Sequence, residues 1–389
     1  MRVLFVSKPV VPPFKDGTKC LVRDIALHAD RVAPIVLSSR ETPALIGPDG
    51  ATRAAIELAP VYSDGGSYAP ALVENLRAAG WVLMRSQADV WHFVFAPNPR
   101  TSQVGRWLRR LRRVPVVQTI ASPPRTFDGC DAILFGDVIV AQSRWTRDQV
   151  LGAYAQKRLR APDVRVVPPP VPVALARSED EIQRARAALE IPAGAPVFVY
   201  PGDLETSSGA EFTTTLVPRL LEALPSAIVI FAYRAKTPRA EGFAERLRAR
   251  LDPRSTRVAG SLSDVLALIA GSRAVLFPVD DLWGKVDLPI VLLEAMILGV
   301  PVLALGQGPL LDLEGARLVP ELDPSAWVEA ALELERDPAA RRGLIDAQLV
   351  ATKRRHGARV VAAAYEELYL ELFARSRSRA PAAASLAAK

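Results

Sequence analysis

The sequence predicts an α/β protein with two domains, each built on a doubly wound parallel sheet with helices on both faces. Short apolar segments rich in β-branched residues alternate with amphipathic segments along most of the 389 residues, and this alternation is typical of parallel sheets that are buried on both sides. Four prolines within residues 168–172 interrupt the alternation, because they suit neither a helix nor an inner strand. The chain is also long enough for two separate cores.

Residues 1–168 should form the first domain. Its apolar runs predict strands at 2–6, 32–37, 54–59, 89–94, 115–119, 137–141 and 164–167, and the apolar residues at helical spacing predict helices at 17–29, 69–85, 99–112 and 143–156. Ligands of such sheets lie beyond the carboxyl ends of the strands. We therefore look for functional side chains where these strands end.

Residues 169–178 should be a stiff, proline-rich linker, and residues 179–355 a second domain that opens with a charged helix around 179–190. Strands are expected at 197–201, 227–232, 256–259, 273–278, 301–305 and 317–319, and helices at 209–224, 240–251, 262–270, 289–298, 324–335 and 338–353. A helix at 356–374 has an apolar face, and residues 375–389 should be a disordered tail. Two such sheets joined by a hinge would face a cleft, where small-molecule sites prefer to lie.

Composition favours a cytoplasmic protein. No apolar run reaches the roughly 18 residues that a membrane span needs, and the N-terminus leads into a strand pattern rather than a signal peptide. Cys20 and Cys130 are too few for a disulfide framework and lack the spacing of metal ligands, so we expect ordinary thiols.

The positive charge lies in the first part of the chain. Residues 1–177 hold 24 Lys and Arg against 14 Asp and Glu, whereas residues 178–389 hold 25 against 28. Such a field favours an anionic membrane surface or an anionic acceptor, and no nucleic-acid motif accompanies it. Residues 105–113 gather Trp107, Leu108 and Leu111 among five arginines, as a basic interfacial helix would. An ordinary surface helix with solvated arginines is the alternative.

Residues 287–304 carry the clearest functional signal. Pro289 suits the first turn of a helix, and Gly299 and Pro301 suit its end. Within this apolar helix stands one carboxylate, Glu294. Burying an ionised group without partners costs several kcal/mol, so Glu294 must reach solvent, backbone donors or a polyhydroxyl ligand. A carboxylate that caps a neighbouring loop is the alternative.

The segment 288–302, LPIVLLEAMILGVPV, resembles the signature of the retaining glycosyltransferases of family four. The resemblance implies the GT-B fold, with two Rossmann-like domains and a final helix that crosses back to the first. It also implies that Glu294 binds the ribose of a nucleotide sugar. The acidic residue that contacts the donor sugar in the family matches Val286 here, and Asp287 stands one place later. We assign Asp287 and Glu294 as the catalytic candidates.

The expected diphosphate site follows the strand at 197–201. Gly202 and Gly209 suit a turn that cradles phosphates, but Asp203 and Ser208 stand where the family has an Arg and a Lys. We hypothesise that Lys285 and Arg234 replace that pair. The other donor-binding candidates are Lys236, Gly260, Ser261 and Leu288. Surface cations of loops are the alternative interpretation of Arg234, Lys236 and Lys285.

The expected acceptor side lies in the first domain. Gly17, Thr18 and Lys19 begin a helix after a proline-rich loop, which is either an anion site or a plain connector. His92 lies in the strand predicted at 89–94, near the same edge, and a lone His in an apolar strand is often a core residue. Gln118 and Ser122 are further hydrogen-bonding candidates, and Ala121 stands where the family has a His.

We therefore expect a retaining glycosyltransferase that moves a sugar from a nucleotide-diphosphate donor to a glycan, lipid-linked or small-molecule acceptor. No cofactor or metal is expected, since the pair Asp280 and Asp281 lacks further ligands. The alternatives are a non-catalytic GT-B partner or binding protein and, less in keeping with the sequence, a GT-B sugar-nucleotide epimerase.

Overall fold

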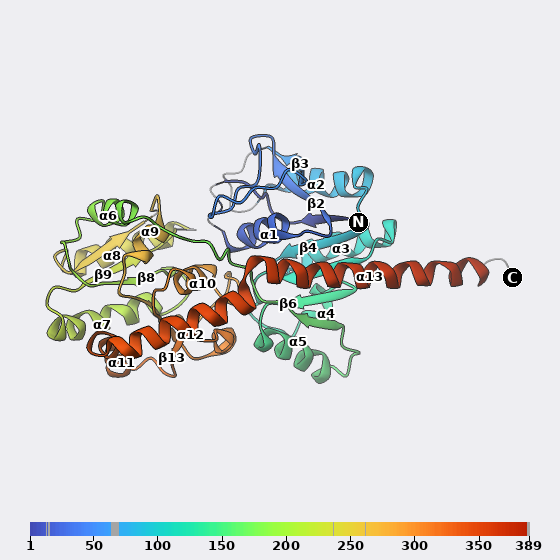
Figure 1. The fold of residues 1–389 in the computed structure, drawn as a ribbon. Coiled ribbons are helices and arrows are strands. Elements are labelled where there is room, and N and C mark those ends of the chain that lie inside the picture. Colours follow the sequence, from blue (N-terminus) through green and yellow to red (C-terminus); the bar gives the residue numbers. More distant parts are fainter. Residues whose placement is uncertain (13, 15, 64–69, 236, 261, 387–389) are drawn as a thin grey trace. The chain divides into compact units, whose positions relative to one another are not determined.

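The chain forms two compact units, each with its own parallel sheet (Figure 1). The computed structural model describes residues 1–12, 14, 16–63, 70–235, 237–260 and 262–386. The first unit comprises Met1–Pro172, Trp283–Asp287 and His356–Lys389, and the second comprises Val173–Leu282 and Leu288–Arg355. The chain thus passes between units at Pro172, inside the proline-rich segment. The short segment Trp283–Asp287 groups with the first unit, although its neighbours in sequence belong to the second.

The first unit contains a seven-stranded parallel sheet in the order β3-β2-β1-β4-β5-β6-β7. The order reverses between β1 and β4, so the sheet is doubly wound. Its strands are β1 Arg2–Val6, β2 Ala33–Ser39, β3 Glu57–Tyr62, β4 Val90–Phe95, β5 Val116–Ile120, β6 Val138–Ala141 and β7 Asp163–Val166, and its helices are α1 Gly17–His28, α2 Leu72–Arg85, α3 Pro99–Arg112, α4 Cys130–Ile133, α5 Arg144–Gln156 and α13 Ala358–Leu386. The sequence analysis missed only the single turn α4.

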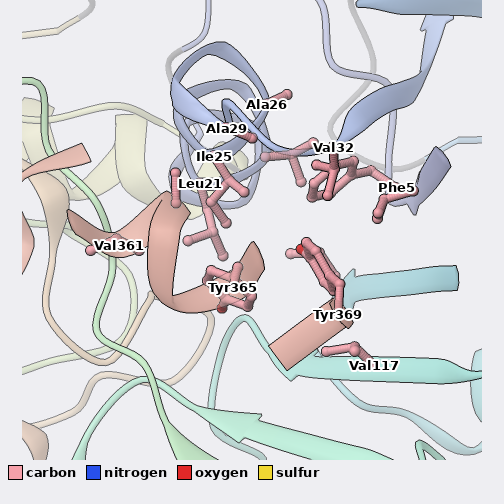
Figure 2. Packing of buried hydrophobic residues seen from close by; sticks show 14 of the residues in the cluster. Phe5, Leu21, Ile25, Ala26, Ala29, Val32, Val117, Val361, Tyr365 and Tyr369 are labelled. Carbon is pink, nitrogen blue, oxygen red and sulfur yellow. The ribbon is translucent and has the colours of Figure 1, made fainter. Parts of the chain in front are cut away.

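Alternate residues of the central strands β1 and β4 face two different cores. On β1, Val3 and Phe5 pack with α1 and α13, whereas Leu4 packs with α2 and α3. The alternation follows from the two-residue period of a strand. Figure 2 shows the first of these cores, in which Leu21 and Ile25 of α1 meet Tyr365 of α13.

Helix α13 belongs to the first unit, and it is longer than expected. It begins at Ala358 and continues to Leu386. The prediction that residues 375–389 lack regular structure is therefore wrong as far as Leu386. The segment is rich in Ala and Arg, which are strong helix formers.

The second unit contains a six-stranded parallel sheet in the order β10-β9-β8-β11-β12-β13. Its strands are β8 Val197–Tyr200, β9 Ile228–Ala232, β10 Thr256–Ala259, β11 Ala274–Phe277, β12 Val302–Leu305 and β13 Arg317–Val319, and its helices are α6 Glu179–Ala187, α7 Gly209–Ala223, α8 Pro238–Arg250, α9 Val265–Ala270, α10 Ile290–Ile297, α11 Pro324–Arg336 and α12 Pro338–His356, with a 3-10 turn at Gly308–Asp312. Its order reverses between β8 and β11. The predicted fold class of two parallel α/β sheets is confirmed.

Candidate functional site

Glu294 is the polar exception on an apolar helix. α10 runs Ile290–Ile297, and its residues Leu293, Ala295 and Met296 are buried. Glu294 is partly exposed. The helix ends as predicted, since Gly299 just beyond it has a φ of 71°, which suits glycine. Part of Glu294 is therefore accessible to solvent, unlike Leu293, Ala295 and Met296 beside it.

Asp287 is placed differently from Glu294, because it groups with the first unit and is fully buried. The hydroxyl of Ser143 donates a 2.6 Å hydrogen bond to the Asp287 carboxylate. Ser143 is also the N-cap of α5, where its oxygen accepts from the Thr146 amide at 3.0 Å. A carboxylate is favourable near a helix N-terminus. Asp287 thus has a structural role, and a sugar contact would require an exposure that it lacks here.

The loop after β8 is held by carboxylates. One oxygen of Asp203 accepts from the amides of Glu205 at 2.9 Å and Thr206 at 2.7 Å. Asp280 accepts from the amide of Ser208 at 2.9 Å and from its hydroxyl at 2.6 Å. Negative charge therefore lies at the loop where the sequence analysis expected phosphates.

The glycines of this loop are required for packing inside the protein. A Cβ at Gly202 would lie 2.1 Å from the Tyr200 ring, and one at Gly209 would lie 2.7 Å from the Pro278 carbonyl oxygen. Both distances are shorter than side-chain contacts allow. The need for glycine here thus has a cause other than a ligand.

The candidate cations do not gather within one unit. Arg234 follows β9 in the second unit and is partly exposed, whereas Lys285 is partly exposed in the segment that groups with the first unit. Lys236 and Ser261 lie outside the described residues. Gly260 directly follows β10, and Leu288 is fully buried, so Leu288 can offer a ligand little beyond its main chain.

The start of α1 is already occupied by a carboxylate. Asp16 accepts from the amides of Thr18 at 3.0 Å and Lys19 at 3.4 Å, and Lys8 pairs with it at 2.6 Å. These amides would otherwise attract an anion. A Cβ at Gly17 would lie 3.0 Å from the Val286 side chain, so the glycine allows close packing within this chain.

His92 is a core residue rather than an acceptor ligand. It is fully buried, and its ring nitrogens lie 2.7 Å from the hydroxyls of Thr119 and Tyr369. Burial lowers the pKa of His92 to about 3, so the imidazole is neutral. The acceptor role expected for His92 is therefore not supported by its surroundings.

Gln118 is likewise occupied. Its amide nitrogen donates to the Ile133 carbonyl at 3.0 Å, and its oxygen accepts from the amides of Phe135 at 2.7 Å and Gly136 at 3.2 Å. These bonds fasten β5 to the loop after α4. The hydrogen-bonding capacity that suggested an acceptor role is used within the protein.

Ser122 and Gln142 differ from these two residues. They follow the carboxyl ends of the neighbouring strands β5 and β6, and they are 5% and 1% exposed. No group in the described residues bonds to the Ser122 hydroxyl or to either polar atom of the Gln142 side-chain amide. Buried polar atoms are nearly always paired. The sequence analysis missed Gln142, although it is a polar residue that directly follows an apolar strand.

The described residues contain neither a metal-binding cluster nor a membrane-spanning helix. They contain no group of three or more His, Cys, Asp or Glu placed to hold a metal ion. None of their helices combines the length and the apolar character required to cross a membrane.

Part of the second unit matches a known family model. Residues 195–337 match the family model described as "Glycosyl transferases group 1". No curated protein sequence matches the chain. The resemblance found at residues 288–302 is confirmed, because these residues lie inside the matched segment.

Solved structures share the fold of the whole chain. HepE from Anabaena, in complex with UDP, has a TM-score of 0.70 at 16% identity, over 95% of this chain and 100% of that chain. Sucrose-phosphate synthase from Thermosynechococcus elongatus has a TM-score of 0.70 at 19% identity, over 96% and 100%. WaaG, a glycosyltransferase involved in lipopolysaccharide biosynthesis, has a TM-score of 0.60 at 15% identity, over 95% and 99%. The chain therefore has the GT-B fold of these structures, and a segment of its second unit matches the group 1 glycosyltransferase model.

Proposed function

We propose that the chain transfers a sugar from a nucleotide-diphosphate donor, held by the second unit, to a hydroxyl-bearing acceptor held by the first. The observation that carries the donor half is Glu294, a partly exposed acidic residue on a largely buried, apolar helix inside the matched segment. Its two oxygens can accept hydrogen bonds from both ribose hydroxyls. The solved complexes of HepE with UDP and with UDP-glucose support a donor of this class.

We propose retention of the anomeric configuration. In such a transfer the bond between the anomeric carbon and the diphosphate oxygen breaks, and its electron pair leaves with the diphosphate. The acceptor oxygen bonds to the same face of the sugar, and its proton passes to a phosphate oxygen. The protein then supplies position and stabilising charge rather than a nucleophile. Arg234 and Lys285 remain the proposed cations for the departing diphosphate.

Ser122 and Gln142 support an acceptor on the first unit. Their unpartnered polar atoms can donate to and accept from sugar hydroxyls. A polyhydroxyl acceptor would relieve the cost of keeping these atoms buried without partners.

Incubation with a panel of nucleotide sugars and simple glycoside acceptors tests the function. We expect release of a nucleoside diphosphate that depends on both substrates, and a product whose anomeric proton coupling matches that of the donor. An inverted product would overturn the mechanism. Tight nucleotide binding without any turnover would instead identify a binding protein, and epimerised donor would identify an epimerase.

We further propose that the reaction takes place in the cytoplasm and uses no metal ion. Cys20 and Cys130 are both buried free thiols, as is usual in a reducing compartment. Addition of a chelator should therefore leave the rate of transfer unchanged.

A further inference from the structure

Two neighbouring helices of the first unit expose an unusual number of apolar side chains. Of the 14 large apolar residues that are exposed in the described part of the chain, seven lie on α2 and α3. They are Leu72, Val73, Leu76 and Met84 on α2, and Val104, Trp107 and Leu111 on α3, and each is between 42% and 74% exposed. We call these seven residues and the arginines among them the α2–α3 surface.

The exposed apolar residues are not part of the core of the unit, because each helix buries a different face in that core. Ala78 and Val82 of α2 and Leu108 of α3 are buried in the same core on one side of the sheet. Both helices therefore turn their outer faces away from that side. Leu108, which the sequence analysis grouped with Trp107 and Leu111, belongs to the inner face.

The exposed residues form stripes on each helix. Val104, Trp107 and Leu111 are three and four residues apart, so they follow one side of α3. On α2, Leu76 and Met84 are two turns apart, and the Met84 side chain reaches over Gly80 between them. An apolar stripe that faces solvent marks a surface for association.

The charge of this surface has one sign. From Leu72 to Arg85 and from Pro99 to Arg113 there are eight arginines and one acidic residue, Glu74. Glu74 is used at the start of α2, where it accepts from the amides of Ser63 at 3.1 Å and Ala71 at 3.0 Å. It does not neutralise the surface as a whole.

The six arginines from Pro99 to Arg113 fall into two groups. Arg106, Arg109 and Arg112 donate to main-chain carbonyls of neighbouring segments, and Arg109 also pairs with Asp137, so these three fasten α3 to the unit. Arg100, Arg110 and Arg113 are exposed. None of these three forms an ion pair with any described residue, so their charge is available to a partner.

We propose that the α2–α3 surface docks on an anionic lipid bilayer, with the apolar stripes among the acyl chains near the headgroups and the exposed arginines against lipid phosphates. Basic side chains flanking apolar ones are the composition of helices that lie in a membrane interface. The uniform positive charge favours an anionic bilayer over a second copy of this chain, whose own arginines would repel it. This docking is separate from the transfer reaction and does not depend on it.

Sedimentation of the full chain with vesicles tests the proposal. We expect binding to phosphatidylcholine vesicles that contain phosphatidylglycerol, little binding to phosphatidylcholine alone, and weaker binding as salt screens the charges. An Arg100→Gln, Arg110→Gln double variant should bind anionic vesicles on the order of tenfold or more weakly, since each surface arginine contributes about fivefold. A Trp107→Ser, Leu111→Ser variant should lose binding at all salt concentrations.

Matched controls come from the second unit. Arg184→Gln with Arg239→Gln removes two exposed arginines from α6 and α8, and Val350→Ser removes an exposed apolar residue from α12. Both controls should bind like the unaltered protein. Equal binding of the unaltered protein to neutral and anionic vesicles, or to neither, overturns the proposal whether or not any variant folds. So does a dimer in light scattering that the Trp107 and Leu111 changes dissolve, since the occupant would then be a second copy.

Discussion

The hydroxyl of Tyr369 lies 2.7 Å from Nδ1 of His92, although 277 residues separate them in sequence. The other ring nitrogen lies 2.7 Å from Oγ1 of Thr119, which lies 3.0 Å from the hydroxyl of Tyr365. A buried polar network therefore joins α13 to strands β4 and β5 inside the first core. It specifies where α13 docks, because every polar atom in it must find its partner.

The network predicts a pH dependence of stability. The folded pKa of His92 is lowered from 6.5 to about 3 by burial, so between these values the unfolded chain binds a proton that the folded chain does not. The free energy of unfolding should therefore fall as the pH drops below 6.5, by at most about 1.4 kcal/mol per pH unit from this group. Urea unfolding of the unaltered protein and of His92→Gln at several pH values measures the difference. A slope that is the same in both proteins would contradict the assignment.

Replacing Gly202 and Gly343 with alanine should change the stability of the protein in opposite directions. Gly202→Ala places a methyl group against the buried ring of Tyr200 and should lower the free energy of unfolding by about 1–3 kcal/mol. Gly343 lies inside α12 with nothing within 4 Å of its Cβ position, so Gly343→Ala should raise that free energy by about 0.5–1 kcal/mol. Denaturant titration of both variants measures these two changes in the free energy of unfolding. If Gly202→Ala is as stable as the unaltered chain, the loop after β8 is not packed as described.

The periodicity of the sequence was sufficient to predict nearly every element of both sheets. The residues that a strand or a helix buries recur at a fixed spacing within that element, so a short stretch of sequence reveals them. The roles of His92 and Gln118 could not be predicted in this way. His92 pairs with Tyr369 and Gln118 with residues 133–136, and no local sequence pattern indicates such distant pairings. Asp287 shows the same limit. The segments on either side of Trp283–Asp287 belong to the second unit, whereas the hydrogen-bond partner of Asp287, Ser143, belongs to the first. Glu294 was found because a charged residue within an apolar helix stands out in the local sequence.

Glu294 should control donor affinity. Glu294→Gln keeps the shape but removes the charge, and hydrogen bonds to a charged group contribute more than neutral ones. We expect the affinity for the preferred nucleoside diphosphate to fall about tenfold to a hundredfold by calorimetry. The matched control is Glu329→Gln on α11, whose side chain is 69% exposed, and it should bind normally. If both variants bind like the unaltered protein, Glu294 does not hold the ribose.

Gln142 should separate acceptor binding from stability. Its side-chain amide is buried without partners, so Gln142→Leu replaces atoms that the fold does not use, and the free energy of unfolding should stay the same or rise. If these atoms bind the acceptor, the same change should raise the acceptor KM while the donor KM stays constant.

Thr352→Val is the control for Gln142→Leu. The Thr352 hydroxyl is also buried and without a partner in the described residues, but it lies on α12 in the second unit. The valine should be neutral or stabilising in the same way and should leave both KM values unchanged. A Gln142→Leu protein with an unaltered acceptor KM would show that Gln142 is an unsatisfied core residue. An acceptor KM that also rises in Thr352→Val would show that the effect on KM is not specific to the carboxyl edge of the first sheet.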